Sequence, residues 1–174
     1  MSENKTIRDT DQEALTMAGD LIVNAMYGSL ALHDQASEYP HISRIQLSTD
    51  VDGTIITLIS TLSAHTKCIA ANPKCALLVG EPAKGDPLAH PRISVPVFAT
   101  QIEHGSSDYQ RIRASHLKHY PKAALYVDFG DFSFFKLKPQ SAALNGGFGK
   151  AYELSKDEVV EAIIVAKTEG DNDE

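Results

Sequence analysis

Hydroxyl and cationic side chains gather in one short segment, where a strand is expected to end and a helix to begin. Ser60 and Thr61 close an apolar, β-branched run, and Ser63 starts the next segment. Thr66 and Lys67 fall in the first turn of the expected helix. Free backbone amides and the helix dipole favour an anion at such a position. The segment predicts either a phosphate site or an ordinary capped helix with one exposed lysine.

An arginine in a neighbouring strand bears on the same chemistry. Arg44 lies in an alternating stretch, on the same face as Ile42 and Gln46. Spacing alone favours a solvated arginine that points outward. An arginine that reached the start of the helix would instead give an anion a bidentate contact. On the residues alone, both interpretations stay open.

Histidines, cysteines and glycines give weaker signals. His116 and His119 are three residues apart on an expected helix, but no cysteine or carboxylate at a matching spacing completes a metal set. We therefore expect surface or capping roles for them and no metal site. Cys68 and Cys75 form no disulfide framework and no zinc knuckle, so we expect both to be small buried hydrophobes. The glycine run at 146–149 follows no strand–turn–helix order and is no dinucleotide fingerprint. No catalytic residue can be assigned from spacing.

Composition limits the class of protein. The chain has 174 residues, of which 43% are hydrophobic and 22% charged, and this suits one domain over residues 1–174. We expect 1–10 and 169–174 to be flexible ends. The net charge of −7, without basic clusters interleaved with aromatics, argues against nucleic acid as a partner. The start carries no basic leader before an apolar stretch, and no apolar run is long enough to span a membrane. We expect a cytoplasmic protein.

Strand signals dominate the elements that must position these residues. Strands are expected over 29–32, 41–47, 54–60, 75–80, 92–103 and 132–137. The first three read as a meander, and Pro96 indicates an edge strand or a bulge. Helices are expected over 11–27, 63–72, 107–119, 121–128 and 156–166. No strand–helix–strand alternation is present, so the pattern favours an α+β barrel of antiparallel strands.

The expected helix ends carry their own signals. Thr10 and Glu13 have the spacing of a capping box for the first helix. Ser63 and Ser155 are expected to be the N-caps of two later helices. The segment 141–152 is too rich in glycine to predict regular structure.

Several motifs resemble one known superfamily. The segment STLSAHTKCIAANPKCALLVG (60–80) is similar to the part of pyridoxamine 5'-phosphate oxidase-like proteins that wraps the FMN phosphate. GDPLAHPR (85–92), FGDFSFFKLKP (129–139) and LNGGFGKA (144–151) resemble hallmarks of its haem-utilisation (HugZ-type) branch. In family order, these motifs cover the chain from about Gly28 to Glu153. The resemblance implies an FMN-binding split β-barrel of about six antiparallel strands with peripheral helices.

The resemblance also implies roles for individual residues. Arg44 matches the strand arginine that holds the FMN phosphate. Ser60 and Thr61 match a pair beside the ribityl chain and the phosphate, with Ser63 following at the start of the helix. The next match is a position that holds two basic residues in the oxidases and reads Thr66–Lys67 here.

Further matches concern the flavin ring, haem and a partner. Arg92 falls near a polar position that touches the flavin ring. His65 and Asp131 match residues of the haem-utilisation branch, and are the candidates if haem is the ligand. Members of the superfamily bind the cofactor at a dimer interface, which implies a homodimer.

Two departures from the family pattern leave three hypotheses. The chain has no tryptophan and lacks the C-terminal substrate motif of the true oxidases. Residues 155–174 contain no histidine, whereas haem-degrading members use one there as the axial ligand. The leading hypothesis is an FMN-dependent oxidoreductase with an unknown substrate. The alternatives are a haem-binding or haem-utilisation protein and a flavin-binding module without turnover.

Overall fold

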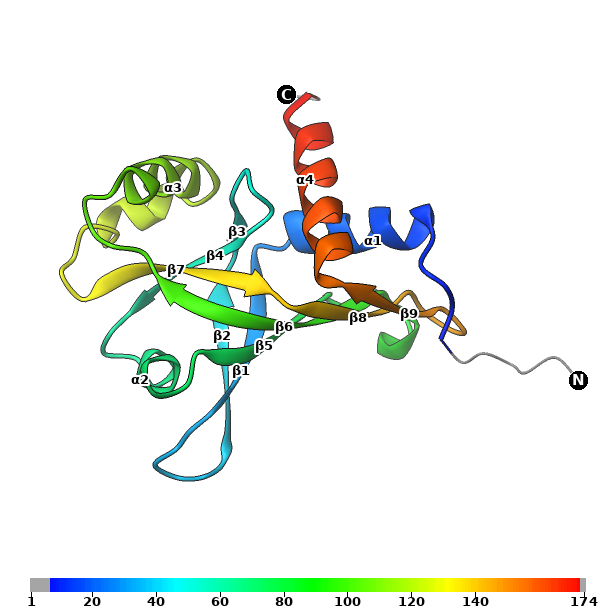
Figure 1. Cartoon of the computed structure of the whole chain (residues 1–174), viewed down its shortest axis with the longest axis horizontal. Coiled ribbons are helices and arrows are strands. Elements are labelled where there is room, and N and C mark those ends of the chain that lie inside the picture. Colours follow the sequence, from blue (N-terminus) through cyan, green and yellow to red (C-terminus); the bar gives the residue numbers. More distant parts are fainter. Residues whose placement is uncertain (1–6, 173–174) are drawn as a thin grey trace, which may run out of the picture.

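A curled antiparallel sheet forms the body of the protein (Figure 1). The computed structural model describes residues 7–172, and within them nine strands form one sheet that accompanies four α-helices. The helices are α1 (Gln12–Val23), α2 (Ala64–Ala71), α3 (Ser107–His119) and α4 (Lys156–Asn172), with two 3-10 helices, η1 (Pro87–Ala89) and η2 (Pro121–Leu125). The strands are β1 (Tyr27–His33), β2 (Pro40–Gln46), β3 (Ser48–Thr49), β4 (Ile55–Ser60), β5 (Lys74–Val79), β6 (Arg92–Gln101), β7 (Phe132–Pro139), β8 (Ser141–Asn145) and β9 (Ala151–Ser155).

The strand order explains how the sheet becomes a barrel. The path is β2-β1-β5-β6-β7-β4-β3, with β8 added to β6 and β9 added to β8. Although β2 and β4 are far apart in this order, they contact each other, so the sheet curls back on itself. The predicted fold class, an antiparallel α+β barrel with peripheral helices, is confirmed. In Figure 1, α1 and α4 lie over the part that holds β8 and β9, whereas α2 and α3 lie at the opposite end.

Three strands beyond the expected six are present, and two of them fall where the sequence predicts irregular structure. β8 and β9 pair with each other, and the glycine run forms only the turn between them. The Gly146 amide donates to the Lys150 carbonyl (2.7 Å), and the Asn145 side chain accepts from the Gly147 amide (3.0 Å). The expectation of irregular structure over 141–152 is therefore wrong, because the glycines serve a hairpin turn and the flanking residues continue the ladder.

The predicted three-stranded meander is also wrong. β1 pairs with β2, but β4 pairs with β3 and β7 instead of β2. The turn at Asp52–Gly53 connects β3 to β4, with Gly53 at φ +75°, a conformation that glycine adopts readily. Pro96 lies in a central strand, opposite Ala76 of β5. Its other side faces the junction between β7 and β8, where the Gln140 amide donates to the Pro96 carbonyl, so its missing N–H breaks no ladder bond.

The helix ends differ in detail from the expected ones. Asp11, and not Thr10, is the N-cap of α1, and its carboxylate accepts from the Ala14 amide (2.8 Å). The segment after Pro121 is a short 3-10 helix instead of an α-helix. Ser155 is the N-cap of α4, as predicted, and its hydroxyl bonds with Glu158; α4 continues past the expected end to Asn172. Of the ends expected to be flexible, 1–6 and 173–174 lie outside the described residues.

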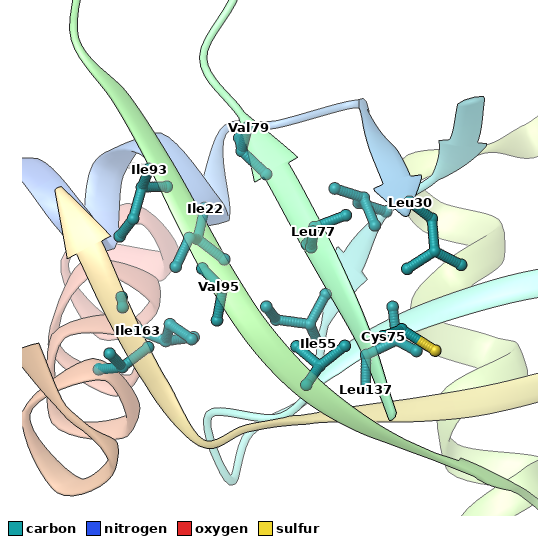
Figure 2. Close-up of a cluster of buried hydrophobic side chains, with 14 of the residues drawn as sticks. Ile22, Leu30, Ile55, Cys75, Leu77, Val79, Ile93, Val95, Leu137 and Ile163 are labelled. Carbon is teal, nitrogen blue, oxygen red and sulfur yellow. The ribbon is translucent and has the colours of Figure 1, made fainter. Parts of the chain in front are cut away.

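Two apolar clusters hold these elements together. The larger one fills the barrel and the space under α1 and α4, and Figure 2 shows part of it, including Ile22, Leu77 and Ile163. The smaller one lies between α3 and the other side of β4 and β7 and is centred on Phe134. Burial of each large aliphatic side chain contributes roughly 1.5–3 kcal/mol. Cys68 and Cys75 are buried and free, as predicted.

Candidate functional site

The expected phosphate-binding residues lie together at the end of β4 and the start of α2. We call Ser60, Thr61, Ser63, Thr66 and Lys67 the anion cradle. Thr66 is buried, whereas Thr61 and Lys67 are exposed. Ser63 is at the N-cap position, but its side chain makes no cap hydrogen bond. The structure therefore brings these five predicted residues together.

Part of the cradle is already hydrogen bonded within the protein. The Ser60 hydroxyl donates to the carboxylate of Asp131 (2.6 Å) and accepts from the Leu62 amide (3.1 Å). The Thr66 hydroxyl donates to the Ser60 carbonyl (2.6 Å), and the Thr61 amide donates to the Asp131 carbonyl (2.7 Å). Asp131, a candidate from the haem-utilisation motif, is thus hydrogen bonded to the cradle.

Arg44 lies on the outward face of β2, as the alternation predicts. It is exposed, and so is Ile42 on the same face, whereas Ile45 on the opposite face is buried. The Arg44 guanidinium carbon lies 4.8 Å from the centroid of the Tyr27 ring. This is a cation–π contact, and it leaves the N–H groups at the edge of the guanidinium open to an anion.

Aromatic residues connect Arg44 to the cradle. Gln46, two residues beyond Arg44, accepts a hydrogen bond from the Tyr126 hydroxyl (3.2 Å). The Tyr126 ring lies 5.0 Å from the ring of Phe132, centroid to centroid, and Phe132 pairs with Ser60 across the β7–β4 ladder. We call the surface formed by these residues the aromatic shelf; its members are Tyr27, Arg44, Gln46, Ser60, Tyr126 and Phe132.

Exposed apolar side chains lie next to shelf residues along the chain. Leu62 follows the end of β4, and Leu125 and Phe129 flank Tyr126; their exposed fractions are 78%, 76% and 57%. Side chains this large seldom stand so far out of a monomer in one region without a ligand or partner to cover them. The shelf therefore combines a cation, aromatic rings and an apolar rim, which suits a flat apolar molecule that carries an anionic group.

The structure places Arg92 away from this surface. Arg92 begins β6, and β1 and β5 separate that strand from β2. Its guanidinium donates to the carbonyls of Leu88 (3.1 Å) and His90 (3.3 Å). Within one chain, Arg92 therefore fixes the loop before β6 and does not join the cradle.

His65 is separated from Arg44 by β2. It faces His41, which alternates with Arg44 along β2 and so belongs to the other face of that strand. The Nε2 atom of His65 is buried and has no hydrogen-bond partner. Burial, with a smaller contribution from His41, lowers the pKa of His65, so the imidazole is neutral at physiological pH.

His116 departs from the expected surface role. It is fully buried in the smaller cluster, where its Nδ1 lies 3.2 Å from the Ser48 hydroxyl, whereas His119 is exposed as expected. Among the described residues, no group of three or more histidines, cysteines and acidic residues is arranged to hold a metal ion. No helix within residues 7–172 has the length and apolar character needed to cross a membrane.

A separate cavity adjoins the shelf through Tyr27. Its volume is about 830 Å³, and it lies between α1 and the ends of β1 and β5. Its apolar lining is Met17, Leu21, Ala25, Met26, Val79 and Pro91. Glu13, Asp20 and Glu81 stand among its lining residues, and three carboxylates disfavour an anionic ligand there.

The aromatic members of the shelf were not among the residues predicted from sequence. Phe132 lies in the quoted motif at 129–139, but its pairing with Ser60 becomes visible only in the β4–β7 register. Tyr126 and Tyr27 come from distant segments and are linked through Gln46, which pairs with Tyr27 and accepts from the Tyr126 hydroxyl. The one available signal was the aromatic density of the segment from Tyr126 to Phe135.

Sequence comparison places the chain beside haem proteins. No protein-family model matches it. It is 34% identical over 136 residues to the non-canonical heme oxygenase HOZ, chloroplastic, of Arabidopsis thaliana, covering 75% of this chain and 41% of that relative. It is 23% identical over 127 residues to the heme oxygenase HutZ of Vibrio cholerae, covering 71% and 72% of the two chains. The chain thus spans less than half the length of the Arabidopsis relative.

Solved structures share the fold. One with 37% identity has a TM-score of 0.79 and covers 87% of this chain and 98% of its own. A heme binding protein from Mycobacterium smegmatis, 23% identical, has a TM-score of 0.78 over 87% and 62% of the two chains. A putative pyridoxamine 5'-phosphate oxidase from Listeria innocua, 17% identical, has a TM-score of 0.56 over 76% and 94%.

Proposed function

We propose that the chain binds haem on the aromatic shelf, because it has the split-barrel fold of pyridoxamine 5'-phosphate oxidase-like proteins and is similar in sequence to two proteins named as heme oxygenases. The leading hypothesis from sequence was an FMN-dependent oxidoreductase. The relatives named as heme oxygenases favour the haem alternative over it.

The observation that carries this proposal is the contact of Arg44 with Tyr27. Haem is a flat apolar ring with two carboxylates on one edge. Arg44 supplies an exposed guanidinium for a carboxylate, and its stacking on Tyr27 holds that group in place. The rings of Tyr126 and Phe132 lie beyond it and offer a surface for the macrocycle. The guanidinium, the rings and the apolar rim therefore suit the porphyrin ring and its carboxylates.

The roles of the protein residues follow from this arrangement. When bound, haem supplies the iron that handles oxygen. Arg44 orients one edge of the ring, and the apolar rim around Leu62 and Phe129 limits the access of water. His65 lies across β2 from the shelf, so the proposal does not depend on it. Because the two curated relatives are named as heme oxygenases, we extend the proposal to haem degradation.

Absorption spectroscopy tests this function. Titration of the purified protein with haemin is expected to give a saturable Soret shift with one haem per chain or per pair of chains. With ascorbate and oxygen, the Soret band of the complex is expected to decay faster than that of free haemin. The absence of a saturable shift would refute haem binding, and a stable Soret band would restrict the protein to binding without degradation.

We propose that a second copy of the chain packs on the outward face of the sheet. Ile42, Ala31, Ala76 and Pro96 are register partners across β2, β1, β5 and β6, so they form an apolar row on that face. Leu78, on the same face, is 47% exposed. Burial of such a row against itself would favour a symmetric homodimer, which places the shelf at or beside the interface.

FMN stays a second candidate because of the anion cradle. The Ser63 side chain makes no cap hydrogen bond, and Lys67 is exposed beside it. Both would be available to a phosphate at the start of α2. A flavin absorption band in the protein as purified would favour this candidate, and a Soret band would favour haem.

A further inference from the structure

Asp131 places a carboxylate where the sequence pattern predicts a ligand phosphate. We propose that Asp131 determines ligand choice by excluding phosphate-bearing flavins from the anion cradle, which leaves the shelf to ligands that carry their charge at Arg44. The part of this proposal that concerns haem rests on the proposed function.

The hydrogen bonds of the cradle are the first support. The Ser60 hydroxyl has one proton, and it is directed to the carboxylate of Asp131 at 2.6 Å. The Thr66 hydroxyl donates to a backbone carbonyl, so its proton is also committed. Of the hydroxyls predicted to bind phosphate, Ser60 is therefore unable to donate to a ligand while Asp131 holds its position, and Thr66 is committed to the backbone.

Charge is the second support. A phosphate monoester carries about −1.5 to −2 charges at neutral pH, and a carboxylate within a few ångströms of it would repel it. Lys67 is the one cation of the cradle. The paired basic residues of the oxidases are reduced to this single lysine, so the net charge of the cradle with Asp131 ionised is zero. A haem carboxylate at Arg44 avoids the repulsion, because Arg44 makes no salt bridge among the described residues and lies on another strand.

The placement of Asp131 is set by its backbone. Its carbonyl accepts from the Thr61 amide, and the next residue, Phe132, donates its amide to the Phe129 carbonyl (3.0 Å). These bonds do not involve the Asp131 side chain, which is half-buried. Substitutions at this position should therefore leave the barrel folded.

Flavin binding in two variants tests the inference. Asp131→Asn removes the charge but keeps an acceptor for Ser60, and Asp131→Ala also frees the Ser60 hydroxyl. Each variant is titrated with FMN and followed by quenching of flavin fluorescence, with thermal unfolding as the check of folding. FMN affinity is expected to rise roughly tenfold or more in Asp131→Asn, and at least as much in Asp131→Ala.

Two controls isolate the phosphate effect. Riboflavin lacks the phosphate, so its affinity should not change in either variant. Asp128→Asn removes a charge three positions upstream, from an exposed carboxylate that pairs with Arg113, and it should leave FMN affinity as in the wild type. Unchanged FMN affinity in both folded Asp131 variants, or an equal gain for riboflavin, would overturn the inference.

Haemin titration of the same proteins separates this inference from the proposed function. A gain in FMN affinity in a protein that never binds haemin would support the exclusion by Asp131 and refute the haem proposal. Haemin binding without any FMN gain would support the haem proposal and refute the role of Asp131.

Discussion

His116 and Ser48 form a buried hydrogen-bonded pair, with the Nδ1 of His116 3.2 Å from the Ser48 hydroxyl. The imidazole also packs against the rings of Tyr120 and Phe134, and its Nε2 is buried without a partner. A charged His116 would therefore leave its Nε2–H buried without an acceptor among the described residues. Burial is the main cause that lowers the pKa of His116 to about 4, and repulsion from His119 adds to it.

The stability of the protein should consequently fall as the pH is lowered. Below its ordinary pKa of 6.5, His116 takes up a proton in the unfolded state but not in the fold. The free energy of unfolding should thus drop as the pH falls from 6.5 towards 4, by up to about 3 kcal/mol. In His116→Phe this part of the drop should be absent. Urea unfolding at pH 7 and pH 4.5 measures both proteins, and an identical loss in the two would show that His116 is not the group responsible.

Close contact of α1 with α4 makes Gly19 sensitive to substitution. A Cβ at this position would clash with the Ala162 carbonyl oxygen, which belongs to the helix backbone and cannot move aside easily. Gly19→Ala should destabilise the fold by about 1–3 kcal/mol despite the better helix propensity of alanine. Gly170→Ala in α4, where a Cβ meets nothing within 4 Å, is the matched control and should be neutral or stabilising. Thermal unfolding that ranks the two variants the other way would contradict the close packing of these helices.

Two serines at N-cap positions should differ in their contribution to stability. The Ser155 hydroxyl bonds with the carboxylate of Glu158 (2.8 Å) and, more weakly, the Glu158 amide, whereas the Ser63 side chain makes no cap bond. Ser155→Ala should cost about 1 kcal/mol of unfolding free energy, and Ser63→Ala close to nothing. Denaturant titration compares them directly. Equal costs would mean that the cap geometry is not the source of stability.

The apolar row on the outward sheet face predicts a dimer. Sedimentation of the wild type should give a dimer at micromolar concentration, and Ile42→Glu together with Leu78→Glu should shift it to monomer, since charged groups would meet across the interface. Val51→Glu serves as control, because Val51 is 66% exposed on the β3–β4 turn, away from the row. A wild type that stays monomeric would refute the proposed interface.

Local signals in the sequence were enough for most of the strands. Alternation placed Arg44 on the exposed face of β2, and the hydroxyl-rich segment correctly marked the β4–α2 junction. These features depend on neighbours in the chain, and the period of a strand or the cap of a helix expresses them directly.

Features set by tertiary pairing were not visible in the sequence. The glycine run masked β8 and β9, because the ladder depends on partners in β6. The burial of His116 results from packing under α3, and the period of that helix alone did not place it there. The bond between Ser60 and Asp131 joins residues 71 positions apart, so no spacing rule predicts it.

The most direct test of the haem proposal compares haemin with its dimethyl ester on the wild type and on Arg44→Ala. Arg44 is proposed to bind a haem carboxylate, so the substitution should weaken haemin binding roughly tenfold or more and leave binding of the ester unchanged. Arg8→Ala, at an exposed arginine beside β9, should leave both affinities as in the wild type. Haemin affinity that is unchanged in Arg44→Ala, or an equal loss for haemin and the ester, would contradict the placement of haem on the aromatic shelf.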